Sequence, residues 1–271
     1  MNVRFPLASH LTEKDNPMSQ SLAGKVALVT GGSRGLGAAT ALALADQGAD
    51  VAISYVASAE KAAAVVESLK AKGVRAVAIQ ADQGNRACAE PLIANVVGQL
   101  GKLDILVNNA AIALQGKTID DPQIDNDAMD RQWAINTMGV IATIRAAVKV
   151  LPEGGRIISV GSGVGTRIAF PGLTDYAASK AAIVGYTRGA ARDLGRRNIT
   201  VNVVQAGVMD TDMAAGVLGS VEQLPPAFEQ AHAIPRVAAL SEVAAAIVFL
   251  AGPDAAFITG SVIDVNGGFT A

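Results

Sequence analysis

The chain has 271 residues, of which 51% are hydrophobic and 17% charged; this composition suits one large α/β domain and excludes an intrinsically disordered chain. Its formal net charge is −2 and its apolar runs are short and interrupted, so we expect binding neither to nucleic acid nor to a membrane. A lone cysteine, Cys88, and only two histidines, His10 and His232, indicate a reducing, cytoplasmic location and no histidine-based metal site.

The chain is expected to begin with a flexible extension and to continue as a single domain. Residues 1–21 are polar and carry two prolines, whereas residues 22–271 show no change of composition that would mark a second domain. Short apolar runs predict strands at 25–30, 51–55, 76–80, 103–108, 156–160, 200–204 and 261–265. Alanine-rich or amphipathic stretches predict helices at 38–47, 60–72, 91–100, 133–150, 175–195 and 242–250.

This alternation predicts an α/β fold, a doubly wound, Rossmann-like parallel sheet of about seven strands with helices on both faces. Two stretches, 113–127 and 209–235, do not fit the alternation and are expected near the carboxyl ends of strands, where such folds bind ligands. The second is apolar, with glycines and a Pro-Pro pair. It predicts either a mobile lid over a substrate or a pair of surface helices packed on the core.

A glycine-rich turn, 30–37, joins the first predicted strand to the first helix. Glycine permits positive φ and a close backbone approach, and a helix amino end offers free N–H groups to a pyrophosphate. An ordinary glycine turn is the alternative, but the position between strand and helix favours a dinucleotide site. The residues predicted to bind the cofactor here are Gly31, Ser33, Arg34, Gly35, Leu36 and Gly37.

The spacing Gly-x-x-x-Gly-x-Gly in this turn resembles that of the single-domain short-chain dehydrogenase/reductase family. From about Leu22 to the C-terminus the chain follows that family's order of motifs. The resemblance implies an oxidoreductase that transfers hydride between a nicotinamide cofactor and a carbonyl or secondary alcohol.

Tyr176 and Lys180 stand four residues apart on the predicted helix 175–195, so their Cβ atoms should lie about 5–6 Å apart on one face. A nearby ammonium favours the phenolate and lowers the pKa of a tyrosine, which would let Tyr176 exchange a proton with a carbonyl oxygen. A chance pairing on an amphipathic helix is the alternative. The resemblance favours the acid–base pair.

Two further catalytic residues are expected. Ser162 follows the strand 156–160, where its hydroxyl can bond a developing alkoxide; Ser159 is a rival, and a plain turn serine is the alternative. The resemblance places the family's serine at about Ser162. It also implies that Asn136 anchors a water linking the lysine to solvent, although a helix-interior asparagine can instead be bonded within the core.

The resemblance supplies the remaining cofactor contacts: Asp82, Gln83, Asn109, Tyr176, Lys180, Val208 and Thr211. Asp82 would bond the adenine amino group, although capping a helix is an alternative. Val208 and Thr211 would hold the nicotinamide carboxamide. Two departures stand out, because Ala111 replaces a usual glycine and Ala206 a usual proline.

The end of the second strand indicates the choice of cofactor. Enzymes that use NAD place a carboxylate there for the ribose 2′-hydroxyl, but here the position holds Tyr55, and no acidic residue follows before Glu60. Arg34 lies within the glycine turn, where its guanidinium can bond a 2′-phosphate; an exposed arginine with no fixed partner is the alternative. We therefore expect NADP(H) in preference to NAD(H).

The sequence thus predicts an NADP-dependent ketone reductase. The alternatives are a 3-oxoacyl-carrier-protein reductase, a dehydrogenase acting mainly on alcohols, and a non-catalytic nucleotide-binding scaffold. Carrier-protein reductases typically have basic residues before the serine's strand, where this chain has Glu153, so a free, moderately apolar ketone is preferred. Alanine-rich helices at 142–150 and 181–195 predict a homotetramer.

Overall fold

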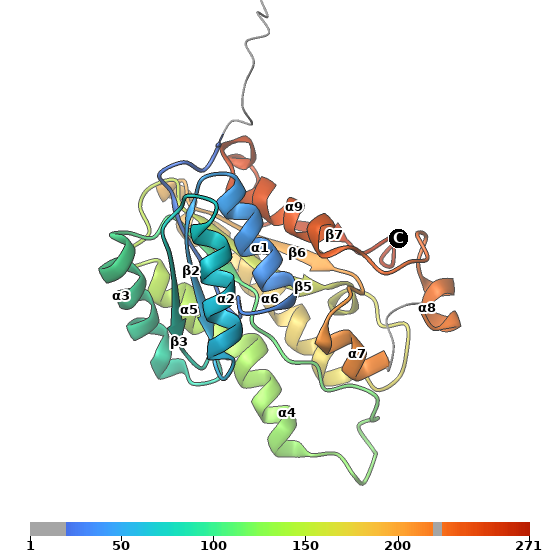
Figure 1. Ribbon diagram of the computed structural model, residues 1–271. Helices are drawn as coiled ribbons and strands as arrows, with labels where there is room; N and C mark the ends of the chain where they lie inside the picture. Colours follow the sequence, from blue (N-terminus) through green and yellow to red (C-terminus); the bar gives the residue numbers. More distant parts are fainter. Residues whose placement is uncertain (1–19, 219–223) are drawn as a thin grey trace, which may run out of the picture.

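The computed structural model describes residues 20–218 and 224–271 (Figure 1). The predicted N-terminal extension, 1–21, therefore lies outside the described residues except for its last two positions. The described chain forms a seven-stranded sheet in the order β3-β2-β1-β4-β5-β6-β7, and every pairing is parallel. The predicted doubly wound α/β fold is confirmed.

The strands lie close to their predicted positions. They are β1 (Val26–Val29), β2 (Asp50–Tyr55), β3 (Ala76–Gln80), β4 (Ile105–Asn108), β5 (Arg156–Ser162), β6 (Thr200–Ala206) and β7 (Val262–Val265). Both β5 and β6 run two residues further than predicted, because each continues to pair with its neighbour. Ser162 is consequently the last residue of β5 rather than part of a loop.

The helices differ more from prediction. They are α1 (Gly35–Asp46), α2 (Ala59–Lys70), α3 (Ala89–Leu100), α4 (Asn126–Trp133), α5 (Val140–Ala147), α6 (Thr174–Leu194), α7 (Asp212–Leu218), α8 (Pro226–Ala231) and α9 (Leu240–Ala251). The single helix predicted over 133–150 is interrupted, because a π-helical segment, Ala134–Gly139, joins α4 to α5. α1 begins inside the glycine turn, three residues before its predicted start.

Two apolar layers hold the helices on the sheet. Side chains alternate between the two faces along each strand, so one face of the sheet meets α1 and α9 and the other meets α3, α5 and α6 (Figure 1). The first layer includes Val29, Leu44, Val107 and Ile247, and the second includes Leu28, Leu106, Ile144 and Ile183. No helix in the described part of the chain is long and apolar enough to cross a membrane.

The strand order reverses between β1 and β4, and the connections from these strands leave to opposite sides of the sheet. Doubly wound folds bind ligands outside the carboxyl ends of the strands at such a switch point. Here Thr30 ties the two ends together, since its hydroxyl accepts hydrogen bonds from the backbone N–H groups of Asn109 (3.0 Å) and Ala110 (3.1 Å). The fold therefore fixes where the site should be.

Candidate active site

A cleft of about 1120 Å³ lies at the carboxyl ends of the strands. Its lining includes all the predicted cofactor residues and three of the four predicted catalytic residues: Gly31, Ser33, Arg34, Gly35, Leu36, Gly37, Tyr55, Asp82, Gln83, Asn109, Ser162, Tyr176, Lys180, Val208 and Thr211. Segments from one end of the chain to the other thus converge on one cleft. Its volume is slightly above the usual range for ligand pockets, about 300–1,000 Å³.

The glycine turn packs so closely on neighbouring backbone that side chains would not fit at two of its positions. Gly31 has a φ of +65°, and a Cβ there would lie 2.9 Å from the Cα of Ala110. A Cβ at Gly37 would lie 2.3 Å from the carbonyl oxygen of Gly31. Because Gly35, Leu36 and Gly37 form the first turn of α1 and also line the cleft, the helix amino end is available to an anion. The turn therefore fits a dinucleotide pyrophosphate.

The Asn109 side chain holds the glycine turn in place by hydrogen bonds to its backbone. Its side-chain amide donates to the carbonyl oxygens of Thr30 (2.9 Å) and Gly31 (3.2 Å). Gln83 makes a similar link, donating to the carbonyl oxygens of Ala110 (2.9 Å) and Ile135 (3.1 Å). Both side chains thus brace loops of the cleft in addition to lining it.

Arg34 has a fixed partner in the structure. Its Nη1 lies 2.7 Å from Oδ2 of Asp212 at the start of α7, and both side chains are more than half exposed, at 61% and 64%. Exposed ion pairs contribute only about 0–1 kcal/mol, so a phosphate can replace this carboxylate at small cost. The alternative of an arginine without a partner is wrong.

Asp82 is held by an arginine that the sequence did not identify. Arg131 in α4 donates from Nη2 to both carboxylate oxygens, at 2.6 and 2.8 Å, and the Gly84 N–H donates to Oδ1 at 2.9 Å. Burial alone raises the pKa of Asp82, but these hydrogen bonds outweigh it and hold the pKa below its ordinary value. Asp82 does not cap a helix, because Asn85 caps the following 3₁₀ turn.

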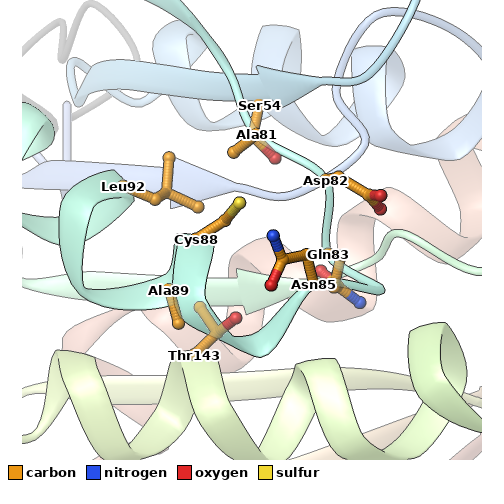
Figure 2. Close-up of a pocket in the computed structure, with 9 residues that line it drawn as sticks. All are labelled: Ser54, Ala81, Asp82, Gln83, Asn85, Cys88, Ala89, Leu92 and Thr143. Carbon is orange, nitrogen blue, oxygen red and sulfur yellow. The ribbon is translucent and has the colours of Figure 1, made fainter.

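A small cavity of about 10 Å³ lies beside Asp82 (Figure 2). Figure 2 shows the Cys88 thiol and the Asn85 amide in the middle of the group, between Ala81 above and Thr143 below. A cavity of this volume holds about one water molecule. Apart from this space for one water molecule, the side chains behind Asp82 fill the wall of the cleft.

The catalytic group lies where β5 ends and α6 begins. Ser162 and Tyr176 both line the cleft, and the Ser162 side chain acts to lower the pKa of the Tyr176 hydroxyl. Lys180, one turn further along α6, donates from Nζ to the carbonyl oxygen of Val160 (3.0 Å), and this nitrogen lies 5.8 Å from the centre of the Tyr176 ring. One proton donor, one hydroxyl and one ammonium therefore share one wall of the cleft.

Burial dominates the titration of this pair. Tyr176 is 8% and Lys180 4% exposed. Burial raises the pKa of Tyr176 to about 12, with the Ser162 hydrogen bond acting in the opposite direction, and lowers the pKa of Lys180 to about 8. In the protein by itself, burial therefore outweighs the expected lowering of the tyrosine pKa by the ammonium. At neutral pH the phenol carries its proton.

Asn136 does not line the cleft. It is buried in the π-helical segment, where its Nδ2 donates to the carbonyl oxygen of Ile112 (2.9 Å) and to Oγ of Ser179 (3.2 Å), and its Oδ1 accepts from the Ile112 N–H (2.9 Å). Both amide donors are thus used within the protein. A water molecule at this position would therefore have to donate a hydrogen bond to a backbone carbonyl oxygen of the segment. Such π-helical turns change the hydrogen bonding of backbone groups and are frequent at functional sites.

Ser159 is not a rival to Ser162 on geometry. It is 1% exposed on the other face of β5, and its hydroxyl has no hydrogen-bond partner among the described residues. It also lies outside the lining of the cleft, whereas Ser162 contributes to that lining.

The two alanine departures are accommodated. Ala111 lines the cleft, and Ala206 ends β6 in regular pairing with β7. Beyond it, the Val208 carbonyl accepts from the Ala238 N–H (2.9 Å), and the Thr211 hydroxyl accepts from the Ala214 N–H (3.2 Å) at the start of α7. These bonds fix the loop without the usual proline.

The stretch 209–235 forms two short helices, α7 and α8, at the cleft. Met209, Met213 and Phe228 line the cleft, while Leu224 is buried. The stretch therefore lines the cleft and also packs on the protein, while the expectation of a mobile lid stays a prediction. Positions 219–223, and the side chains of Val217 and Leu218, lie outside the described residues.

Comparisons with known proteins agree with this arrangement. A family model described as "Enoyl-(Acyl carrier protein) reductase" matches residues 31–270. A 3-oxoacyl-[acyl-carrier-protein] reductase from Staphylococcus aureus is 39% identical over 248 residues, covering 90% of this chain and 97% of the relative. Versicolorin reductase 1 from Aspergillus parasiticus is 38% identical over 256 residues, covering 91% and 97%. The crystal structure of a Burkholderia cenocepacia short-chain dehydrogenase in complex with NADP is 45% identical, with a TM-score of 0.85, covering 93% of this chain and 100% of that one.

We call the glycine turn 30–37 the glycine cradle. Together with the fold and with Ser162, Tyr176 and Lys180, it defines an oxidoreductase that acts on CH–OH groups or the corresponding carbonyls. The chain belongs to the short-chain dehydrogenase/reductase family.

Proposed function

We propose that the protein is an NADP(H)-dependent carbonyl reductase that acts on a free ketone, with Tyr176 as the proton donor. The observation that carries the proposal is the convergence of Ser162, Tyr176 and Lys180 in the same cleft as the glycine cradle. Support for NADP(H) comes from the exposed Arg34 at that cleft and from Tyr55, where an NAD enzyme would place a carboxylate. The Burkholderia relative was crystallised in complex with NADP.

In the proposed reaction NADPH supplies the hydride. Gly31 and the first turn of α1 hold the pyrophosphate, and Ser162 donates a hydrogen bond to the substrate's carbonyl oxygen. Tyr176, protonated at neutral pH, gives its proton to that oxygen as negative charge develops. Lys180, held by the Val160 carbonyl, stabilises the phenolate that remains.

This chemistry predicts an alkaline limit on ketone reduction. Because the pKa of Lys180 is lowered to about 8, its ammonium is present below that pH and is lost as the pH rises through it. We expect kcat/KM for reduction to be level on the acid side of about pH 8 and to fall above it. The check is a pH profile of the wild type and of Lys61→Ala, an exposed lysine outside the cleft whose removal should leave the profile unchanged. A level profile that extends well above this pH would contradict the role of Lys180.

A second candidate is a 3-oxoacyl-carrier-protein reductase, which the Staphylococcus aureus relative favours. The expectation that Glu153 would repel a carrier protein at the site is wrong. Glu153 precedes β5 and so lies near the amino ends of the strands, whereas the cleft lies at their carboxyl ends. A different observation supports the free ketone. The described cleft lining holds two arginines: Arg34 is assigned to the cofactor 2′-phosphate in this proposal and Arg131 is paired with Asp82, which leaves neither for an acidic carrier protein.

The two candidates differ in a simple assay. Free ketones and acyl groups bound to carrier protein are offered with NADPH, and the loss of NADPH absorbance is followed. We expect faster turnover of a free ketone. Faster turnover of the carrier-bound acyl group than of every free ketone would transfer the proposal to the second candidate.

We also propose a cytoplasmic homotetramer. Support comes from a stripe of small, exposed residues along α6, Ala181, Gly185 and Gly189, where a Cβ at either glycine would meet nothing within 4 Å. Such a stripe lets a second helix approach closely, as in a twofold-symmetric pairing. Light scattering at micromolar concentration should give about four times the 27.5 kDa of one chain. A monomeric mass would refute this assembly.

A further inference from the structure

Beyond the catalytic wall, the cleft is lined by a group of rings that the catalytic chemistry does not use. Phe228, His232 and Phe269 all face the cleft, and Phe170 stacks behind Phe228 with ring centres 4.5 Å apart. The His232 and Phe269 rings lie 5.0 Å apart. We call Phe170, Phe228, His232 and Phe269 the aromatic wall. Its members come from three separate parts of the chain, so only the fold brings them together.

The aromatic wall begins directly beside the catalytic serine. A Cβ at Gly163, the residue after Ser162, would lie 2.9 Å from Cδ1 of Phe269, so the ring rests on the backbone at that point. Phe269 is buried, and the Arg167 guanidinium lies 5.3 Å from the centre of its ring. Arg167 also donates to the Phe269 carbonyl. The ring nearest the reacting carbonyl is therefore fixed in place.

His232 adds one directed polar atom to this apolar surface. Its Nδ1 lies 2.6 Å from the carbonyl oxygen of Phe228. A carbonyl oxygen only accepts hydrogen bonds, so Nδ1 carries a proton and Nε2 of the neutral ring is an acceptor. Within residues 20–218 and 224–271, Nε2 has no hydrogen-bond partner. It is available to a donor on a bound molecule.

We propose that the substrate is an aryl ketone that carries a hydroxyl group, and that His232 is the residue that selects for that hydroxyl. This inference rests on the proposed ketone reduction. Flat rings pack with centres about 4.5–7 Å apart, the spacing already found within the aromatic wall. The aryl ring packs on Phe228 and Phe269 while its ketone reaches Ser162. The substrate hydroxyl donates to Nε2 of His232.

The test uses three ketones of similar size: acetylnaphthalene, its derivative with a hydroxyl on the second ring, and the fully saturated acetyldecalin. We expect the wild type to prefer the hydroxylated aryl ketone to plain acetylnaphthalene by about tenfold in kcat/KM, mostly through KM. His232→Phe keeps a ring but removes the acceptor, so the ratio of kcat/KM for the hydroxylated ketone to that for plain acetylnaphthalene should fall to about one. His232→Gln, which restores an acceptor, should recover part of the preference.

Phe269→Leu should lower kcat/KM for both aryl ketones and leave kcat/KM for acetyldecalin unchanged. Phe257→Leu is the matched control, because that ring is fully exposed outside the cleft and its loss should change nothing. Binding of the naphthyl alcohol products, followed by their fluorescence, gives a readout that does not depend on turnover.

Two results would overturn the inference: acetyldecalin reduced as well as the aryl ketones, or His232→Phe keeping the preference for the hydroxyl. Both leave ketone reduction itself intact. Failure of the proposed function would look different, because then the wild type would reduce none of the three ketones with NADPH.

Discussion

Tyr176→Phe should lower the turnover of ketone reduction by about 10²- to 10⁴-fold, the usual contribution of a positioned proton donor. The phenylalanine ring fills the same buried space, so the fold and the cleft stay intact while the hydroxyl and its proton are lost. NADPH affinity should be kept, because the glycine cradle is not changed.

The measurement compares kcat and the NADPH dissociation constant in the wild type, Tyr176→Phe and Tyr186→Phe. Tyr186 is the matched control, since it lies in the same helix but outside the cleft. Near-normal turnover by Tyr176→Phe would remove the basis of the proposed mechanism.

The second large effect concerns cofactor choice. The wild type should prefer NADPH to NADH by at least about tenfold in kcat/KM, because a hydrogen bond from a charged donor contributes about 1.5–3 kcal/mol, or about 10- to 150-fold. Arg34→Ala should lose most of this preference by lowering activity with NADPH and not with NADH. Asp212→Asn should act in the opposite direction, because it frees Arg34 from an exposed ion pair of about 0–1 kcal/mol.

Both cofactors are measured on the wild type, Arg34→Ala, Asp212→Asn and Arg75→Ala. Arg75 is the control because it also pairs with an aspartate, Asp50, but lies outside the cleft. Equal or better use of NADH by the wild type would show that neither Tyr55 nor Arg34 governs cofactor choice.

Local features of the molecule could be predicted from the sequence. Apolar runs gave the strands, and glycines at fixed spacing gave the turn before α1, because both depend on neighbouring residues. The order of the motifs then placed the serine, tyrosine and lysine at the same edge of the sheet. The direction of β5 places Glu153 away from the cleft, because Glu153 precedes the strand and the cleft lies at the strand's carboxyl end.

Contacts between distant segments could not be predicted. Arg131 and Asp82 are 49 positions apart, and Arg34 and Asp212 are 178 apart, so no periodicity links them. The same holds for Phe269 against Gly163. The pKa of Tyr176 was misjudged for a related reason: helical spacing reveals the neighbouring lysine, but only the packed structure reveals the extent of burial.

In the proposed reaction this cleft reduces a ketone with a hydride from NADPH and a proton from Tyr176. The most direct test is the mass of the alcohol formed when an aryl ketone is incubated with NADPH that carries deuterium at the transferred position of the nicotinamide. We expect the wild type to give an alcohol with a single deuterium on the carbinol carbon, and Tyr176→Phe to give almost none. Oxidation of NADPH without deuterium in the alcohol, or equal labelled product from the variant, would contradict the proposed reaction.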